Sequence, residues 1–293
     1  MPISKFISRI LTFFVFANWF LVGCNPVYQT NIIPTTTITP TLPPIFTPTP
    51  TLLPTLDITP SASDTGWDLV QPGLEKRVIN IYSNQNQFAE SLYILRLDQN
   101  LFRLDIAYNE TPKDLKNWQS ETKAIVVVNG GYFRIENDKY IPNGLTIAGG
   151  KTLGNSYDVF AGMLVINETG AELRWLANKP YDLNEEPLAA LQSFPVLVKP
   201  VGKIGFPEQY EDGVQARRTV IGQDTNGRIL FIVASKGYFT LHQLSVYLTK
   251  SDLNLDIAIN LDGGPSSGIL VANSQEIIPA QTPLPLVILA YAR

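Results

Sequence analysis

The sequence predicts a strand-rich α+β fold with mixed sheets and a few helices, formed by a single globular domain at residues 67–293. Short apolar runs rich in β-branched residues far outnumber helical patterns in this region. These runs do not alternate regularly with helical segments, which argues against a TIM barrel and against a doubly wound sheet. The region contains neither a second linker nor an internal repeat, so one domain accounts for it.

Residues 1–24 have the pattern of an export signal. Lys5 and Arg9 precede an uncharged, mostly apolar stretch at residues 10–22, which is short for a membrane-spanning helix. The stretch ends in Leu-Val-Gly-Cys24, which resembles the lipobox of bacterial lipoproteins, where cleavage precedes a cysteine that receives a diacylglycerol. The alternative is an uncleaved N-terminal anchor with an incidental cysteine. The pattern predicts an exported protein held at the bacterial membrane by lipid on Cys24, with its domain extracellular or periplasmic.

Residues 25–66 are predicted to be a disordered tether. Between residues 26 and 60 the chain has 9 Pro and 11 Thr, and Asp57 is the one charged residue. Proline at this density favours extended polyproline II and cannot pack a core. We therefore expect a stalk between the membrane and the domain.

Within the domain, residues 91–97 and 101–108 are predicted to form a hairpin across residues 98–100. Phe102, Leu104 and Ile106 lie on one face of the second strand, because side chains alternate along a strand. Thr111 and Pro112 then have the pattern of a helix start, with the helix reaching about residue 120. Residues 124–128 form a continuous apolar run that is typical of a buried strand.

The remaining elements follow the same reasoning. A turn is predicted at residues 224–227, where Asp, Thr, Asn and Gly join two strands. A second helix is predicted at residues 240–252, with Leu241, Leu244, Val246 and Leu248 on its apolar side. Further strands are predicted at residues 144–148, 160–166, 171–176, 194–198, 217–222, 228–234, 256–261, 267–272 and 285–291.

The composition excludes several kinds of chemistry. One Cys and one His allow neither an internal disulfide, nor a Cys-based zinc site, nor a multi-histidine metal centre. With 22 basic and 26 acidic residues the chain carries no basic footprint, so no nucleic-acid partner is expected. No cofactor is required. Carboxylates at a strand end can hold Ca²⁺, but no ligand spacing in this sequence demands it.

Two loops share one design, a buried strand followed by a polar residue and Gly-Gly. The first is Asn129-Gly130-Gly131, and the second is Asp262-Gly263-Gly264, followed by Pro265, Ser266 and Ser267. Glycine permits positive φ and close approach of a ligand, and successive amides in such a turn can bind an anion. The structural alternative is two tight turns. Arg218 lies at the start of another predicted strand, where its guanidinium would complement a phosphate placed between the two loops. The alternative for this arginine is a solvated position at the strand edge.

These motifs resemble those of the phosphodiester glycosidase family. The resemblance covers residues 90–293 and rests on Asn-Gly-Gly-Tyr-Phe at 129–133, Pro-Asn-Gly at 142–144, Arg-Thr-Val-Ile-Gly at 218–222 and Asn-Leu-Asp-Gly-Gly-Pro-Ser-Ser at 260–267. Pro265 departs from the family pattern, where a third glycine is common, and residues 192–198 replace a more Gly-rich segment. Bacterial members are often described as exopolysaccharide-related proteins of the cell envelope.

The resemblance implies hydrolysis of a sugar-1-phosphodiester in a glycan or polysaccharide, which releases the sugar and leaves a phosphomonoester. It implies Asp262, Asn129 and Arg218 as catalytic residues, with Gly130, Gly131, Gly263, Gly264, Ser266 and Ser267 binding substrate. Asp262 is the essential carboxylate, with three roles left open: nucleophile, base for water, or orienting group. The candidates for a second carboxylate all lie in predicted loops: Glu136, Asp138, Asp158, Glu211 and Asp212.

Two other functions are compatible with the sequence. The first is a non-catalytic surface lipoprotein that binds a glycan or a phosphate through the same loops. The second is a serine hydrolase that uses Ser266 or Ser267 with His242 as base. That reading lacks a Gly-x-Ser-x-Gly context, and His242 is expected near the start of a helix, on its surface.

Overall fold

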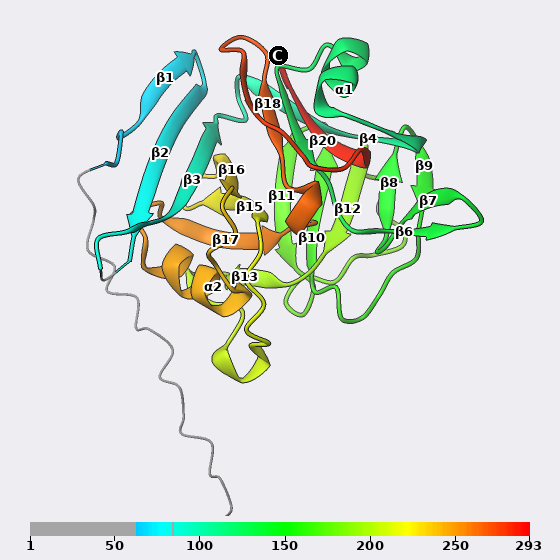
Figure 1. The fold of residues 1–293 in the computed structure, drawn as a ribbon. Helices are drawn as coiled ribbons and strands as arrows, with labels where there is room; N and C mark the ends of the chain where they lie inside the picture. The colour runs from blue at the N-terminus through cyan, green and yellow to red at the C-terminus, as the bar shows by residue number, and fades with distance from the viewer. Residues whose placement is uncertain (1–62, 84) are drawn as a thin grey trace, which may run out of the picture. The chain divides into compact units, whose positions relative to one another are not determined.

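The computed structural model describes residues 63–293 except residue 84 (Figure 1). The predicted export signal, Cys24 and nearly all of the predicted tether lie outside the described residues. The described part contains two α-helices, two short 3-10 helices and twenty strands, which confirms the strand-rich α+β prediction. Within it, no helix combines the length and apolar character needed to cross a membrane.

The largest sheet has eight strands. Their bounds are β1 Asp68–Gln71, β2 Leu74–Tyr82, β3 Phe88–Leu97, β13 Val196–Lys199, β14 Lys203–Ile204, β15 Arg218–Asp224, β16 Ile229–Ala234 and β17 Leu255–Asn260. The strand order is β1-β2-β3-β16-β15-β17-β13-β14. The predicted turn at residues 224–227 is confirmed, because the Gly227 amide donates to the Asp224 carbonyl between β15 and β16.

Two five-stranded sheets and one hairpin complete the fold. The first sheet contains β4 Phe102–Lys113, β5 Val126–Asn129, β18 Ile269–Val271, β19 Glu276–Ile278 and β20 Leu284–Ala292, in the order β19-β18-β5-β20-β4. The second contains β8 Thr146–Ala148, β9 Lys151–Leu153, β10 Gly162–Asn167, β11 Gly170–Trp175 and β12 Ala189–Ser193, in the order β11-β10-β12-β8-β9. The hairpin is formed by β6 Phe133–Glu136 and β7 Lys139–Pro142. Every strand pair named here is antiparallel.

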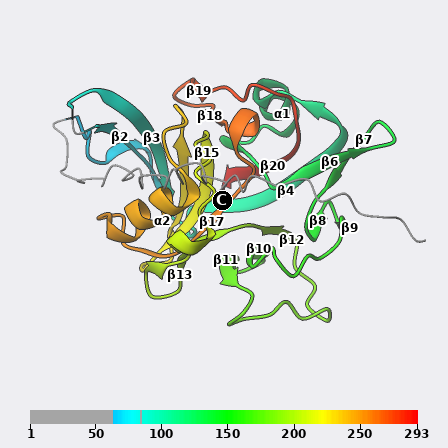
Figure 2. The same cartoon turned by 60° about the horizontal axis from the view of Figure 1, so that its bottom comes forward.

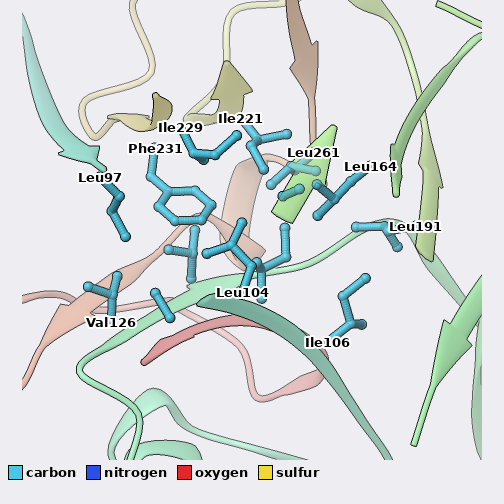
Figure 3. Close-up of a cluster of buried hydrophobic side chains, with 14 of the residues drawn as sticks. Leu97, Leu104, Ile106, Val126, Leu164, Leu191, Ile221, Ile229, Phe231 and Leu261 are labelled. Atoms are coloured by element: carbon cyan, nitrogen blue, oxygen red, sulfur yellow. The ribbon is translucent and has the colours of Figure 1, made fainter. Parts of the chain in front are cut away.

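The three large sheets share one apolar core. Figure 3 shows side chains from all three sheets converging, with Phe231 of β16 near Leu104 of β4, and Leu164 of β10 near Leu191 of β12. Each of these four side chains is buried. The inward positions of β4 include Phe102, Leu104 and Ile106, as their alternation predicts.

Two α-helices cover outer faces of this arrangement. Helix α1, Leu115–Thr122, packs beside β5 and β18, and α2, Leu241–Lys250, packs beside β13 (Figures 1 and 2). Helix α2 begins close to its predicted start. Its N-cap is Thr240, whose hydroxyl accepts from the Gln243 amide at 3.2 Å, while the Gln243 side chain accepts from the Thr240 amide at 3.2 Å.

The predicted start of the first helix was wrong. Thr111 and Pro112 lie at the end of β4, and the N-cap is Asp114, whose carboxylate accepts from the Asn117 amide at 2.7 Å. Pro112 is tolerated there because β4 is an edge strand of its sheet, where a missing N–H need not break a ladder. The carboxylate of Asp114 thus caps the start of α1.

The predicted hairpin at residues 91–108 was also wrong. A turn is present, since the amides of Leu101 and Phe102 both donate to the Asp98 carbonyl. However, β3 pairs with β2 and β16, while β4 pairs with β20 in another sheet. The turn therefore carries the chain from one sheet to the next. Both edges of β3 are occupied, so no ladder with β4 can form.

Candidate active site

The two Gly-Gly loops meet in space, although they follow strands of different sheets. The first loop extends β5 and the second extends β17. The side-chain amide of Asn129 donates to the Asp262 carbonyl at 2.7 Å, and the Asp262 amide donates to the Gly130 carbonyl at 3.1 Å. The structure thus brings Asn129 and Asp262 together, as the shared design of the loops led us to expect.

Asn129 is fully engaged by the protein. Its side chain is buried, and its amide oxygen accepts from the Thr219 hydroxyl at 2.7 Å and from the Gly268 amide at 3.0 Å. Thr219 belongs to β15, so Asn129 ties the first loop to the strand that carries Arg218. These bonds leave Asn129 as a residue that positions the second loop.

Asp262 is a half-buried carboxylate at the centre of this arrangement. One of its oxygens accepts from the Gly263 amide at 3.0 Å. Burial raises the pKa of Asp262 to about 6, and hydrogen bonds from the Ser266 side chain and the Gly263 amide oppose that rise. Asp262 therefore exchanges a proton close to neutral pH, which suits a group that takes part in acid–base or nucleophilic chemistry.

Arg218 lies at the start of β15 and is buried, with 8% of its surface exposed. Its guanidinium donates to the Val214 carbonyl at 2.7 Å, and none of the ion pairs formed among residues 63–293 includes it. Burial lowers its pKa from the ordinary value, but an arginine remains charged at neutral pH. A Cβ placed on Gly263 would lie 3.9 Å from Arg218 Nη1, so the guanidinium borders the second loop.

Arg217 adds a second cation on the same loop. Its guanidinium donates to the carbonyls of Ser267 at 2.8 Å and Pro279 at 3.0 Å, and its Nε is buried with no hydrogen-bond partner in the described part of the chain. Neither Arg217 nor Arg218 forms a salt bridge with another described residue. Two guanidinium groups hydrogen-bonded to carbonyl oxygens place positive charge beside the second loop, where an anionic ligand could bind.

Tyr132 and Asn260 also belong to the site, and sequence reasoning gave neither a role. The Tyr132 hydroxyl donates to the Phe194 carbonyl at 2.8 Å and accepts from the Asn260 side chain at 2.7 Å. Burial and the negative charge of Asp262 raise the pKa of Tyr132, while Arg218 opposes this, so all three groups interact. Tyr132 directly follows Gly131, and Asn260 directly precedes Leu261, so both belong to the family motifs. A polar side chain inside each motif was the feature from which their role could have been predicted.

The family model for phosphodiester glycosidases matches residues 122–286. This segment is more than half of the chain and contains both Gly-Gly loops and both arginines. The chain belongs to the phosphodiester glycosidase family. The resemblance read from the motifs is confirmed, and the family assignment covers the whole of the candidate site. No curated protein sequence matches the chain.

Two solved structures share the fold of this phosphodiester glycosidase domain. One is the catalytic domain of zebrafish N-acetylglucosamine-1-phosphodiester α-N-acetylglucosaminidase, auto-inhibited by its pro-peptide. It is 19% identical, with a TM-score of 0.61, and the match covers 76% of this chain and 85% of that chain. The other is a hypothetical protein from Synechocystis, 11% identical, with a TM-score of 0.57 and coverage of 76% and 63%.

The glycines of this phosphodiester glycosidase domain serve packing more than positive φ. Of Gly130, Gly131, Gly263 and Gly264, only Gly264 has a positive φ, of 57°. A Cβ on Gly130 would lie 3.0 Å from the Leu286 carbonyl oxygen, so the neighbouring strand excludes a side chain there. Three of the four positions therefore do not use the positive φ that glycine permits.

Most amides of the two loops are already bonded within the domain. The amides of Gly130 and Gly264 donate to the carbonyls of Leu286 and Arg217, at 2.9 and 2.8 Å. The amides of Asp262 and Gly263 donate within the two loops, as described above. An anion at this site would therefore be held chiefly by the guanidinium groups, because these amides have no free proton to donate.

The two serines of the second loop differ in their surroundings. Ser266 is buried and hydrogen-bonds the Asp262 carboxylate, as its effect on that pKa shows. Ser267 is fully buried, and its hydroxyl has no partner among the described residues. His242 lies near the start of α2, with its ring Nδ1 2.9 Å from the Phe206 carbonyl oxygen. Among the described residues, no hydrogen bond joins His242 to Ser266 or Ser267.

The five candidates for a second carboxylate differ in their location and in their partners. Glu136 lies in β6, not in a loop, and pairs with Arg134. Asp138 and Asp158 are exposed. The remaining two lie on the segment before β15. Glu211 accepts from the His242 amide at 2.9 Å and from the Thr240 hydroxyl, while Asp212 and Glu211 both interact electrostatically with Arg218.

No group of three or more His, Cys, Asp or Glu side chains among residues 63–293 is placed to hold a metal ion.

Proposed function

We propose that this protein is a glycosidase that hydrolyses sugar-1-phosphodiester linkages of glycans. The observation that carries the proposal is the buried guanidinium of Arg218, which forms no salt bridge with a described carboxylate, donates to the Val214 carbonyl and borders the loop of Asp262. A buried cation held only by carbonyls leaves its charge available to a bound phosphate. The zebrafish structure supports the same class of reaction, because its name specifies an N-acetylglucosamine-1-phosphodiester.

The proposed reaction exchanges one bond at the anomeric carbon. Oxygen from water becomes bonded to C1, and the bond from C1 to the phosphate oxygen breaks, so the products are the free sugar and a phosphomonoester. Arg218 and Arg217 stabilise the charge on the leaving phosphate. Because this leaving group departs as an anion, protonation by a general acid is less necessary than for an ordinary glycoside.

Asp262 acts in its ionised form, as nucleophile or as base for the attacking water. Both roles need a carboxylate close to the anomeric carbon. Asn129 positions the loop that holds Asp262 through the bond to its carbonyl. The pKa of about 6 means that the active form accumulates as the pH rises through that value.

The test is hydrolysis by the full chain of an N-acetylglucosamine-1-phosphodiester and of a panel of sugar-phosphate polymers, with released sugar as the measurement. We expect release by wild type, with kcat/KM rising with pH around 6, and a loss of about 100-fold or more in Asp262→Ala and Arg218→Ala. The control is Asp138→Asn, which changes an exposed carboxylate on the turn between β6 and β7 and should keep wild-type activity.

Two outcomes would contradict the proposal. If wild type releases no sugar from any substrate, the protein is not a glycosidase of this class. If wild type binds the glycans without hydrolysing them, and Asp262→Ala retains that binding, the protein is the binding lipoprotein considered above.

We also propose that the domain is attached to the bacterial membrane by lipid on Cys24 and separated from it by the tether at residues 25–66. The lipobox-like sequence at residues 21–24 and the Pro- and Thr-rich composition that follows it support this placement.

A further inference from the structure

A cavity of about 460 Å³ lies beside the candidate active site, between β11, β13 and the start of α2. This volume falls in the range of small-molecule sites. We call it the apolar pocket. It is lined by Val159, Ala161, Trp175, Phe194, Pro195, Val196, Lys199, Gly205, Phe206, Tyr210, Asp212 and Leu241.

The apolar pocket adjoins the site at Phe194. The Phe194 carbonyl accepts from Tyr132 and Asn260, while the Phe194 ring lines the pocket. Aromatic rings also connect the site to the pocket. The ring centroid of Phe160 lies 5.6 Å from that of Tyr132 in the site and 6.2 Å from that of Phe194. The centroid of Phe206, which lines the pocket, lies 6.3 Å from that of Phe194. On the other wall, Asp212 lines the pocket and interacts with Arg218.

The lining of the pocket fits a hydrocarbon better than a sugar. Only Lys199 and Asp212 carry charge, and the Lys199 ammonium is 4.7 Å from the centroid of the Trp175 ring. A buried hydroxyl without a hydrogen-bond partner costs free energy, and a sugar ring brings several such groups. At the pocket, Val159 is 68% and Tyr210 is 64% exposed, so apolar surface there is open to a ligand.

We propose that the apolar pocket binds the alcohol portion of the substrate, and that this alcohol is an alkyl or prenyl chain. The proposal rests on the function proposed above and narrows it to sugar-1-phosphodiesters of apolar alcohols. Water adds to C1, the bond from C1 to the phosphate oxygen breaks, and the alkyl phosphate departs with its chain in the pocket. Arg218 thus binds the phosphate of the leaving group, and the apolar pocket binds its hydrocarbon chain.

The first test measures binding and does not require turnover. The full chain is titrated with octyl phosphate, below its micelle concentration, and with methyl phosphate. We expect octyl phosphate to bind at least about 30-fold more tightly, since burying each methylene strengthens binding roughly fourfold at best. Val159→Asp and Tyr210→Ala should reduce this preference by about tenfold or more. The control Leu183→Asp, at an apolar residue that is 88% exposed, should leave it unchanged.

Equal binding of the two phosphates by wild type would overturn the proposal, as would an octyl preference that persists in both pocket variants. The second test compares kcat/KM for methyl and octyl diesters of the same sugar. A higher value for the octyl diester that falls in Val159→Asp supports the pocket as an alcohol site. Equal kcat/KM values for the two diesters would show that the pocket does not bind the alcohol portion, and the glycosidase function would remain supported. Tight octyl phosphate binding without any hydrolysis would reject the glycosidase function alone.

Discussion

Asp262 illustrates how the fold of this phosphodiester glycosidase domain sets the chemistry of one residue. Its main chain is held by hydrogen bonds with Asn129 and Gly130, and one oxygen of its carboxylate accepts from the Gly263 amide. Burial raises its pKa to about 6 even though two hydrogen bonds favour the ionised form. Folding therefore works against the charge that the proposed reaction needs.

This cost leads to a prediction about stability. The pKa of Asp262 is higher in the folded than in the unfolded chain, so the ionised group destabilises the folded state above pH 6, and the effect vanishes below about pH 4. Asp262→Asn should therefore raise the free energy of unfolding by about 1–3 kcal/mol at pH 7. Thermal unfolding of both proteins at pH 7 and pH 4 tests it. A constant difference in Tm at the two pH values would contradict it.

At the scale of elements, caps and sheet edges decide where helices and strands end. Helix α2 begins at a capping box, in which the side chains of Thr240 and Gln243 each accept from the other residue's amide. Helix α1 begins later than predicted, because Asp114 is the cap and β4 continues through Pro112. At the start of α2, the His242 amide donates to the Glu211 carboxylate. This bond links the helix to the segment that precedes Arg218.

Removal of the α2 cap should be measurable. Thr240→Ala deletes the hydroxyl that accepts from the Gln243 amide and that donates to Glu211. We expect a loss of about 1–2 kcal/mol in the free energy of unfolding. Urea denaturation provides the measurement, and Thr240→Ser, which retains the hydroxyl, should recover most of the loss. If the alanine and serine variants are equally stable, the cap is not the cause.

At the scale of the whole molecule, the candidate site lies where two sheets come together. The loops that follow β5 and β17 meet at the Asn129 side chain, and β15 adds Thr219 and Arg218. These strands also contribute to the shared core, with Val128, Ile221 and Ile259 among its buried members. A packed interior resists local shifts, so the core holds the loops in register with one another.

The proposed attachment of the chain to the membrane is tested at this scale too. Cys24→Ser removes the thiol that would receive the lipid, and it changes no residue of the domain. We expect wild type in the membrane fraction and a large shift of Cys24→Ser to the soluble or uncleaved form, as seen by fractionation and by mass spectrometry of the N-terminus. An unchanged distribution with an unmodified cysteine would reject the lipid anchor.

The sequence by itself determined the strand-rich class, most strands, both helices and the family, because alternation, apolar runs and short motifs are local properties. It also pointed to Asn129, Arg218 and Asp262, since polar residues after buried strands stand out against an apolar background. It did not identify Tyr132 and Asn260 as members of the site.

Only the tertiary structure decided which strands pair and which groups face one another. The turn at Asp98 leads to a different sheet and not to a hairpin, because both neighbours of β3 come from elsewhere in the chain. The engaged amides of the loops, the bond from Arg217 to the Ser267 carbonyl and the burial that raises the pKa of Asp262 likewise depend on residues distant in sequence. Burial and long-range hydrogen bonds create these properties, and no local pattern encodes them.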